Sequence, residues 1–200
     1  MKITLSNGDK VREAKLVMLG STEAGKSSIV NRLIRDIFTQ NMASTIGTVF
    51  FSKTLQVNDT LVKLQIWDTS GSERYRALAP MYFREADAAI IVYDITSNQS
   101  FQEVEAWYKT LRDQGPDNII IALAGNKNDL KNKRAVDINN GRACAEKHSI
   151  PIFMETSALT GENVSQIFTE VAKYLINSDF PREKKLEFIS ENQDKEKKCC

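Results

Sequence analysis

The chain has 200 residues, of which 42% are hydrophobic, and its formal net charge is +1 at pH 7. This length and composition suit one domain of ordinary size with a sizeable buried core. The nearly balanced charge gives no overall field that would favour nucleic acid or an acidic substrate as a partner. The longest clean apolar run, 88–93, is far too short to span a membrane, and the first residues lack the apolar core of a signal peptide.

Short apolar runs alternate with helical patterns along the chain. The predicted strands are 14–19, 50–57, 61–67, 88–94, 119–125 and 152–154. The predicted helices are 27–35, 101–114, 136–148 and 164–177. Asn58, Asp59 and Thr60 separate the second strand from the third and predict a hairpin. Ser100 and Glu103 have the spacing of a capping box, which predicts a helix start at this point.

This alternation predicts an α/β domain with a six-stranded, mostly parallel sheet flanked by helices. Ligands of such sheets bind beyond the carboxyl ends of the strands, so the loops after Leu19, Trp67, Gly125 and Glu155 are expected on one rim. We expect three segments: an N-terminal extension at 1–12, the domain at 13–178 and a flexible tail at 179–200. The tail is predicted to be solvated because its many charges are mixed with few apolar residues.

A phosphate-binding motif follows the first predicted strand. Residues 20–27 read GSTEAGKS, which fits G-x-x-x-x-G-K-[ST] between a strand and a helix. The glycines let successive backbone N–H groups turn inward, and the helix N-terminus adds partial positive charge. Lys26 can reach the β- and γ-phosphates, and Ser27 can bind Mg²⁺. The predicted phosphate-binding residues are Gly20, Ser21, Thr22, Glu23, Ala24, Gly25, Lys26, Ser27 and Ser28.

Two other interpretations of this motif stay open. The stretch can also be a glycine-rich turn that caps an ordinary helix. Glu23 is unusual because a carboxylate repels a polyphosphate, so we expect it to point to solvent. If it instead faces the phosphates, it would weaken nucleotide retention and speed exchange.

A second motif predicts which base is bound. Residues 126–129 read NKND and directly follow a predicted strand. The Asp129 carboxylate can accept hydrogen bonds from both guanine N1–H and the exocyclic amino group, a pair of donors that adenine lacks. The stem of Lys127 can lie along the purine, and Asn126 can tie this loop to the phosphate loop. The stretch METSAL at 154–159 then offers the backbone N–H groups of Ser157 and Ala158 to guanine O6, with Leu159 beside them. Alone, NKND is also a plausible polar turn.

The set GSTEAGKS, STIGTVF, KLQIWDTSG, VYDIT, NKND and ETSA resembles the Ras superfamily of small GTPases. Within it, IGTVF, KLQIWDTSG, SERY, MYFREA and VYDIT are similar to the Rab branch. The stretches RYRALAPMYFREADAAIIVYDIT and NKRAVD, with the final Cys-Cys, are most similar to the early-endosomal Rab subgroup. The resemblance covers about 12–178 and the last two residues. It implies the P-loop small-GTPase fold and a GTP-binding switch that regulates vesicle trafficking and endosomal membrane fusion by recruiting effectors.

The resemblance also implies roles for single residues. Thr45 would bind Mg²⁺ and sense the γ-phosphate, and Asp68 would hold Mg²⁺ through water. The N–H of Gly71 would meet the γ-phosphate, and Phe38 would pack edge-on against guanine. Loss of the γ-phosphate would remove the contacts that order the two loops containing Thr45 and Gly71. Both loops would then relax. The implied effector-binding residues are Ile46, Phe50, Trp67 and Tyr82. For the three aromatic residues among them, core or hairpin packing is an alternative.

Ser72 departs from the family pattern. In Ras, a glutamine in this part of the site orients the attacking water, and a serine side chain is too short to span the same gap. The implied catalytic set is therefore Ser72, Gly71 and Lys26 with slow intrinsic hydrolysis, and Ser70 adds a second hydroxyl nearby. Three alternatives remain: a largely GTP-locked binding module, a Rab activator of the TBC type that supplies an arginine and a glutamine, or a Ser72 without kinetic effect.

The last two residues are cysteines. Cys199 and Cys200 resemble the double geranylgeranylation site of Rab proteins, since two lipid chains give stable anchoring where one is marginal; free thiols are the alternative. The implied location is the cytoplasmic face of endosomal or other vesicle membranes, with a cytosolic pool. The implied partners are an exchange factor, a GTPase-activating protein, a GDP-dissociation inhibitor, a prenylation escort and effectors. We expect a monomer that binds no nucleic acid. A P-loop nucleotide kinase is a distant rival, which a preference for guanine over adenine nucleotides would exclude.

Overall fold

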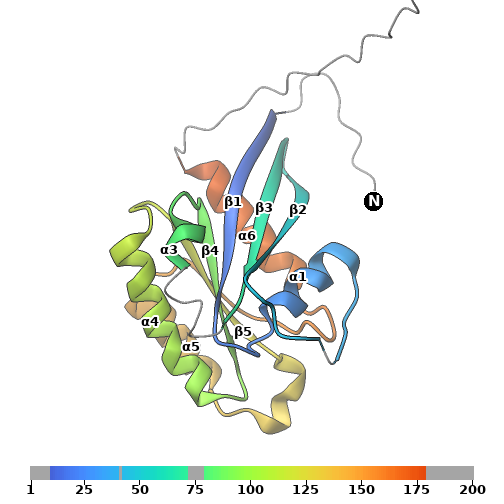
Figure 1. Cartoon of the computed structure of the whole chain (residues 1–200), viewed down its shortest axis with the longest axis vertical. Helices are drawn as coiled ribbons and strands as arrows, with labels where there is room; N and C mark the ends of the chain where they lie inside the picture. Colours follow the sequence, from blue (N-terminus) through green and yellow to red (C-terminus); the bar gives the residue numbers. More distant parts are fainter. Residues whose placement is uncertain (1–9, 41, 72–78, 179–200) are drawn as a thin grey trace, which may run out of the picture.

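The computed structural model describes residues 10–40, 42–71 and 79–178 of the chain (Figure 1). Its strands are β1 (Lys10–Gly20), β2 (Thr48–Val57), β3 (Thr60–Thr69), β4 (Ala88–Asp94), β5 (Ile120–Asn126) and β6 (Ile152–Glu155). Its helices are α1 (Lys26–Arg35), α3 (Ala79–Phe83), α4 (Asn98–Gln114), the 3₁₀ helix η1 (Asn128–Lys133), α5 (Ile138–Lys147) and α6 (Val164–Asn177).

The strands form one six-stranded sheet in the order β2-β3-β1-β4-β5-β6. Only the β2–β3 pair is antiparallel, and Asn58 in the turn between them has a left-handed φ of 53°. All seven residues of β4 and of β5 are buried, as is typical of central parallel strands that are covered on both faces. The predicted α/β class and the mostly parallel six-stranded sheet are thus confirmed.

Helices cover both faces of the sheet (Figure 1). Because successive strand side chains point to opposite faces, Leu16 and Met18 of β1 join the core under α1 and α6. Val17 and Leu19 join the second core, which α3, α4 and α5 complete. With both faces covered, the rim at the carboxyl ends of the strands is left open for a ligand.

Strand β1 begins four residues before the predicted start at 14. Three of its first four residues are charged, so they show no apolar run. In the sheet, however, Glu13 accepts hydrogen bonds from Lys63 (2.8 Å) and Gln65 (3.1 Å) of the neighbouring strand. These cross-strand partners compensate for the missing apolar pattern.

Helix α4 also begins earlier than predicted, and the predicted capping box is wrong. Ser97, not Ser100, is the N-cap, and its side chain accepts a hydrogen bond from the Ser100 N–H at 3.2 Å. The Ser100 hydroxyl is buried inside the first turn, where it donates to the carbonyl of Ser97 at 2.8 Å. Helix α5 begins two residues later than predicted, because Asp137 caps it by accepting from the Asn139 N–H at 2.8 Å.

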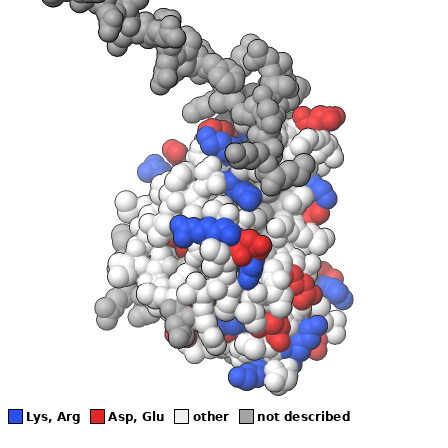
Figure 2. Space-filling view, turned by 90° about the vertical axis from the view of Figure 1, so that its right-hand side faces the viewer, with Lys and Arg blue, Asp and Glu red and all other residues white. Residues whose placement is uncertain are grey.

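Two further observations concern the charged side chains on the surface and the length of the helices. On the face shown in Figure 2, lysine and arginine side chains alternate with aspartate and glutamate instead of gathering in one patch. Among the described helices, none combines the length and the apolar character that a membrane crossing needs.

Candidate nucleotide-binding site

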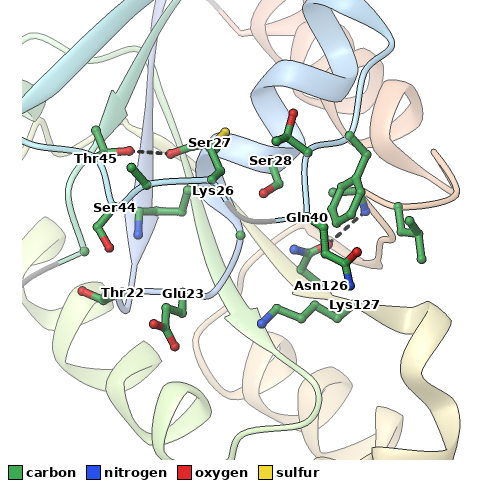
Figure 3. Close-up of a pocket in the computed structure, with 18 of the residues that line it drawn as sticks. Thr22, Glu23, Lys26, Ser27, Ser28, Gln40, Ser44, Thr45, Asn126 and Lys127 are labelled. Atoms are coloured by element: carbon green, nitrogen blue, oxygen red, sulfur yellow. Dashed lines mark hydrogen bonds between the residues drawn. The ribbon is translucent and has the colours of Figure 1, made fainter.

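A cavity of about 1470 Å³ opens at the carboxyl-end rim of the sheet. It brings together the loop after β1, the segment before β2, the end of β3 and the loops after β5 and β6 (Figure 3). The predicted site residues that line it are Thr22, Glu23, Gly25, Lys26, Ser27, Ser28, Phe38, Thr45, Ile46, Gly71, Asn126, Lys127, Asp129, Ala158 and Leu159. Gly20, Ser21, Ala24, Asp68 and Ser157 lie behind this lining and are predominantly buried.

Part of the lining was not predicted from the sequence. Thr39, Gln40, Met42, Ala43 and Ser44 join Phe38 to Thr45 and wall one side of the cavity. Their types carry no specific chemistry. The only available signal was their place in the chain between two predicted site residues.

The two motif glycines are required by the geometry of the phosphate loop. Gly20 has a φ of 133°, and a β-carbon there would lie 2.0 Å from the carbonyl oxygen of Val92. Gly25 has a φ of 92°, and a β-carbon there would lie 2.2 Å from Nδ2 of Asn126. Larger residues would therefore open the loop. Glu23 holds a left-handed φ of 64° and is exposed at the lining of the cavity, which is compatible with both expected orientations of its side chain.

Lys26 is a buried cation at the start of α1. Its Nζ donates to the carbonyl oxygens of Gly20 (2.9 Å) and Ser21 (2.8 Å). Burial lowers the pKa of Lys26 to about 8, against smaller opposing effects of Asp68 and Glu103. Two neutral carbonyls compensate only partly for the lost hydration of a charge, so the position favours an anionic ligand.

Three oxygen-bearing side chains converge beside Lys26. Ser27 Oγ and Thr45 Oγ1 are 2.7 Å apart, as the dashed line in Figure 3 marks. Asp68 is buried next to them, and its Oδ1 makes no hydrogen bond within the described part of the chain. Burial raises the pKa of Asp68, while Ser27, Lys26 and Thr45 oppose that rise. A hydroxyl pair and an orphaned carboxylate oxygen suit Mg²⁺, which prefers oxygen ligands.

The loops at the other end of the cavity are held together by Asn126. Its Nδ2 donates to the carbonyl of Ala24 at 2.9 Å, which ties it to the phosphate loop as expected. Its Oδ1 accepts from the Ala158 N–H at 3.3 Å. Lys127 has a left-handed φ of 68°, and its Nζ pairs with Asp94 at 2.6 Å. One buried amide therefore joins the phosphate loop to both loops of the base end.

Asp129 lies at the cavity wall, and Oδ1 of its carboxylate accepts from the Ser157 hydroxyl at 2.6 Å. Among the described residues, the second oxygen of the carboxylate has no hydrogen-bond donor, so it remains for a ligand. The backbone N–H of Ser157 donates to Glu162 at 3.0 Å, so this group is not available to a base. The predicted amide contact of Ser157 is therefore corrected: Ser157 acts through its hydroxyl on Asp129.

Arg134 supports the loop that carries Asp129. The sequence motifs did not predict this role. It donates to Glu155 Oε2 at 2.8 Å and to Asn128 Oδ1 at 3.2 Å, and so joins η1 to the end of β6. The hydrogen bond to Glu155 raises the pKa of Arg134 above its ordinary value. The stretch NKRAVD contains this arginine, but only the fold shows its partners.

The sequence matches the Ras family model over residues 15–177. The chain belongs to the Ras family. It is 46% identical to the Ras-related protein Rab-5A of Dictyostelium discoideum, over 98% of this chain and 100% of that protein. It is 52% identical to RABF2a of Arabidopsis thaliana, over 85% of this chain and 84% of that protein. The related RABF2b of the same plant is 51% identical over 84% of each chain.

This Ras-family chain is therefore a small GTPase of the Rab type, and the predicted resemblance to endosomal Rab proteins is confirmed. Members of the Ras family bind guanine nucleotides and hydrolyse GTP. This activity fits a cavity with the buried Lys26 at one end and Asp129 at the other. The rival assignment as a nucleotide kinase is thereby removed.

The effector residues implied by the resemblance lie outside the base end of the cavity. Ile46 is 83% exposed and Phe50 52% exposed. The Phe50 and Trp67 rings pack edge to face with centroids 5.6 Å apart, while Tyr82 is half-buried against the core. These aromatic side chains therefore pack against one another or against the core and remain partly exposed to solvent. Ser72, Cys199 and Cys200 lie outside the described residues.

Proposed function

We propose that this Rab-type GTPase is a membrane-anchored switch that alternates between GDP and GTP and recruits effectors in vesicle trafficking at endosomal membranes. The convergence of Lys26, Ser27, Thr45 and Asp68 at one end of the cavity carries the proposal. Similarity to a relative named Rab-5A supports the trafficking role.

Each polar group has a part in this cycle. Lys26 neutralises the β- and γ-phosphates, and the N–H of Gly71 donates to the γ-phosphate. A β-carbon at Gly71 would lie 2.4 Å from the backbone N of Thr22, so only glycine lets this backbone approach the phosphate loop. Ser27, Thr45 and Asp68 would hold Mg²⁺, which supplies charge neutralisation to the phosphate oxygens.

The effector surface is coupled to the γ-phosphate through two short segments. Thr45 directly precedes the exposed Ile46, and the carbonyl of Gly47 accepts from the Ser70 N–H at 2.9 Å. Loss of the contacts at Thr45 and Gly71 would release both segments together. A partner that reads Ile46, Phe50, Trp67 and Tyr82 would then bind the GTP form preferentially.

Hydrolysis by this switch is proposed to be slow because Ser72 cannot orient water as a glutamine does. A largely GTP-locked binding module is the second candidate, and the serine is the observation that favours it. An activating partner that brings its own water-orienting group would restore the cycle.

Replacing Ser72 with glutamine is expected to speed GTP hydrolysis by at least about tenfold, because correct placement of the attacking group has effects of this size. The measurement is the single-turnover loss of γ-phosphate from protein loaded with GTP and Mg²⁺. Ser72→Asn is the matched control: its amide is one methylene shorter, and the slow rate should persist. An unchanged rate in Ser72→Gln would show that this position does not limit hydrolysis.

The chain is proposed to consist of an N-terminal extension at 1–12, a GTPase domain at 13–178 and a tail at 179–200. The tail is proposed to carry two geranylgeranyl groups, on Cys199 and Cys200. The roughly 20 residues of 179–200 would span about 25 Å as a flexible chain, enough to separate the domain from the bilayer. The proposed partners are an exchange factor, an activating protein, a GDP-dissociation inhibitor, a prenylation escort and effectors, with a cytosolic pool beside the membrane-bound one.

The double change Cys199→Ser and Cys200→Ser is expected to move the protein entirely from the membrane fraction to the cytosolic fraction. Binding of GDP should stay within about twofold of wild type, because neither cysteine belongs to the phosphate or base motifs. Fractionation of cells that express each form gives the result. Membrane association that persists without both thiols would refute the lipid anchor.

A further inference from the structure

Arg32, in the last turns of α1, reaches the loop that follows β6. Its Nε donates to the carbonyl oxygen of Ala158 at 2.9 Å, and its Nη2 donates to that of Leu159 at 2.8 Å. Its Nη1 donates to both the backbone and the carboxylate of Asp36, each at 2.9 Å. The Arg32 side chain is only 17% exposed, and its contact with Ala158 is partly buried, whereas the contacts with Asp36 and Leu159 lie at the surface.

The hydrogen bonds from Arg32 to the carbonyls of Ala158 and Leu159 fix the orientation of these peptide units at the cavity wall. In a trans peptide the C=O and the following N–H point in opposite directions. Holding the Ala158 oxygen outward therefore turns the Leu159 N–H away from Arg32. Both residues line the cavity. From the inner side, the Ala158 N–H rests against Asn126 Oδ1 at a long 3.3 Å.

We infer that Arg32 is a positioning residue for base recognition: it holds the Ala158 carbonyl so that the backbone N–H of Leu159 is presented to the O6 of guanine. The inference rests on the proposed base site and adds a specificity-determining residue to it. Arg32 itself does not line the cavity.

An arginine is suited to this part because its guanidinium is a planar fork with donors at fixed angles. One side chain can thus hold two consecutive carbonyls and Asp36 together. A lysine has one compact charged nitrogen on a flexible stem, so it lacks the rigid fork that fixes the spacing and the angle of the two carbonyls. A turn that is already ordered before the nucleotide arrives binds more tightly, because less conformational freedom is lost. The cation on the carbonyl side also polarises the peptide units and strengthens their N–H donors.

The test compares three nucleoside diphosphates that differ at the base. GDP and IDP both carry O6, whereas 2-aminopurine riboside diphosphate lacks it and retains the 2-amino group. In Arg32→Lys, release of GDP and of IDP is expected to be about fivefold to tenfold faster than in wild type, the effect of one weakened hydrogen bond. Release of the 2-aminopurine nucleotide should change by less than about twofold. Arg32→Gln, which keeps a shorter pair of polar atoms, should show the same pattern and serves if the lysine variant folds poorly.

Asp36→Ala is the matched control, since it removes the carboxylate contact of Arg32 and leaves both loop carbonyls in place. Its release rates should stay within about twofold of wild type for all three nucleotides. Equal acceleration of all three nucleotides in Arg32→Lys, or no acceleration of any, would overturn the inference. A wild-type protein without preference for GDP over ADP would instead defeat the proposed base site, so the two failures are distinguishable.

Discussion

Asp129→Asn is expected to lower the affinity for GDP by about 10²–10⁴-fold, because two charge-assisted hydrogen bonds of about 1.5–3 kcal/mol each are lost. The Asp129 carboxylate accepts from the Ser157 hydroxyl at 2.6 Å and has acceptor capacity left for guanine. An asparagine amide would place its own NH₂ group against a donor of guanine. Affinity for xanthosine diphosphate should rise in the same variant, since its C2 carbonyl can accept from that NH₂ group.

Calorimetric titration of the nucleotide-free variant with GDP and xanthosine diphosphate measures both changes. Asp113→Asn, an equal change of charge at an exposed position of α4, should leave both affinities within about twofold. The assignment of Asp129 fails if the asparagine variant keeps its preference for GDP.

Lys26→Met is expected to lower the affinity for GDP by about 10²–10⁴-fold, because it leaves buried phosphate charge without its partner, a loss of about 3–5 kcal/mol. Methionine keeps most of the volume of the stem. In the absence of nucleotide, the same substitution should instead stabilise the fold. Since burial lowers the pKa of Lys26 from 10.5 to about 8, the cost of the buried charge to the empty fold develops as the pH falls below about 10.5 and is complete below about 8, and methionine removes that cost.

Thermal unfolding at pH 7, with and without GDP, separates these effects. The empty variant should melt no lower than the empty wild type, and the increase of Tm that GDP causes should be largely lost. Lys53→Met is the control, since Lys53 also donates to a backbone carbonyl, that of Leu33 in α1 at 3.1 Å, but lies outside the cavity. A lower Tm in the empty variant together with unchanged GDP affinity would assign Lys26 a role in folding alone.

The sequence predicted best those elements whose signal is local. The run 88–94 coincides with β4 and the pattern at 164–177 with α6, because dense apolar residues and helical periodicity need no knowledge of neighbours. The polar start of β1 was missed because Glu13 finds Lys63 and Gln65 only after the sheet forms. The start of α4 was placed wrongly because Ser97 and Ser100 are equally suitable caps until the position of Asp94 decides between them.

The candidate site divides in the same way. The sequence motifs predicted the phosphate and base residues, and the structure brings most of them to one cavity. Arg32 and Arg134 were not predicted, since each acts on backbone or side chains of distant segments. Arg32, for example, contacts a carbonyl 126 residues away. Such supporting contacts arise only when α1 packs on the sheet near the loop that follows β6, and they leave no pattern in the sequence.

The central claim is that one cavity grips a polyphosphate around Lys26 and reads a purine with Asp129. The wild-type arm of the calorimetric titration tests it most directly, with GDP and ADP added to nucleotide-free protein in the presence of Mg²⁺. The claim predicts that GDP binds at least about 10⁴-fold more tightly than ADP, because adenine leaves the Asp129 carboxylate without its donors. Equal affinity for the two nucleotides would contradict it.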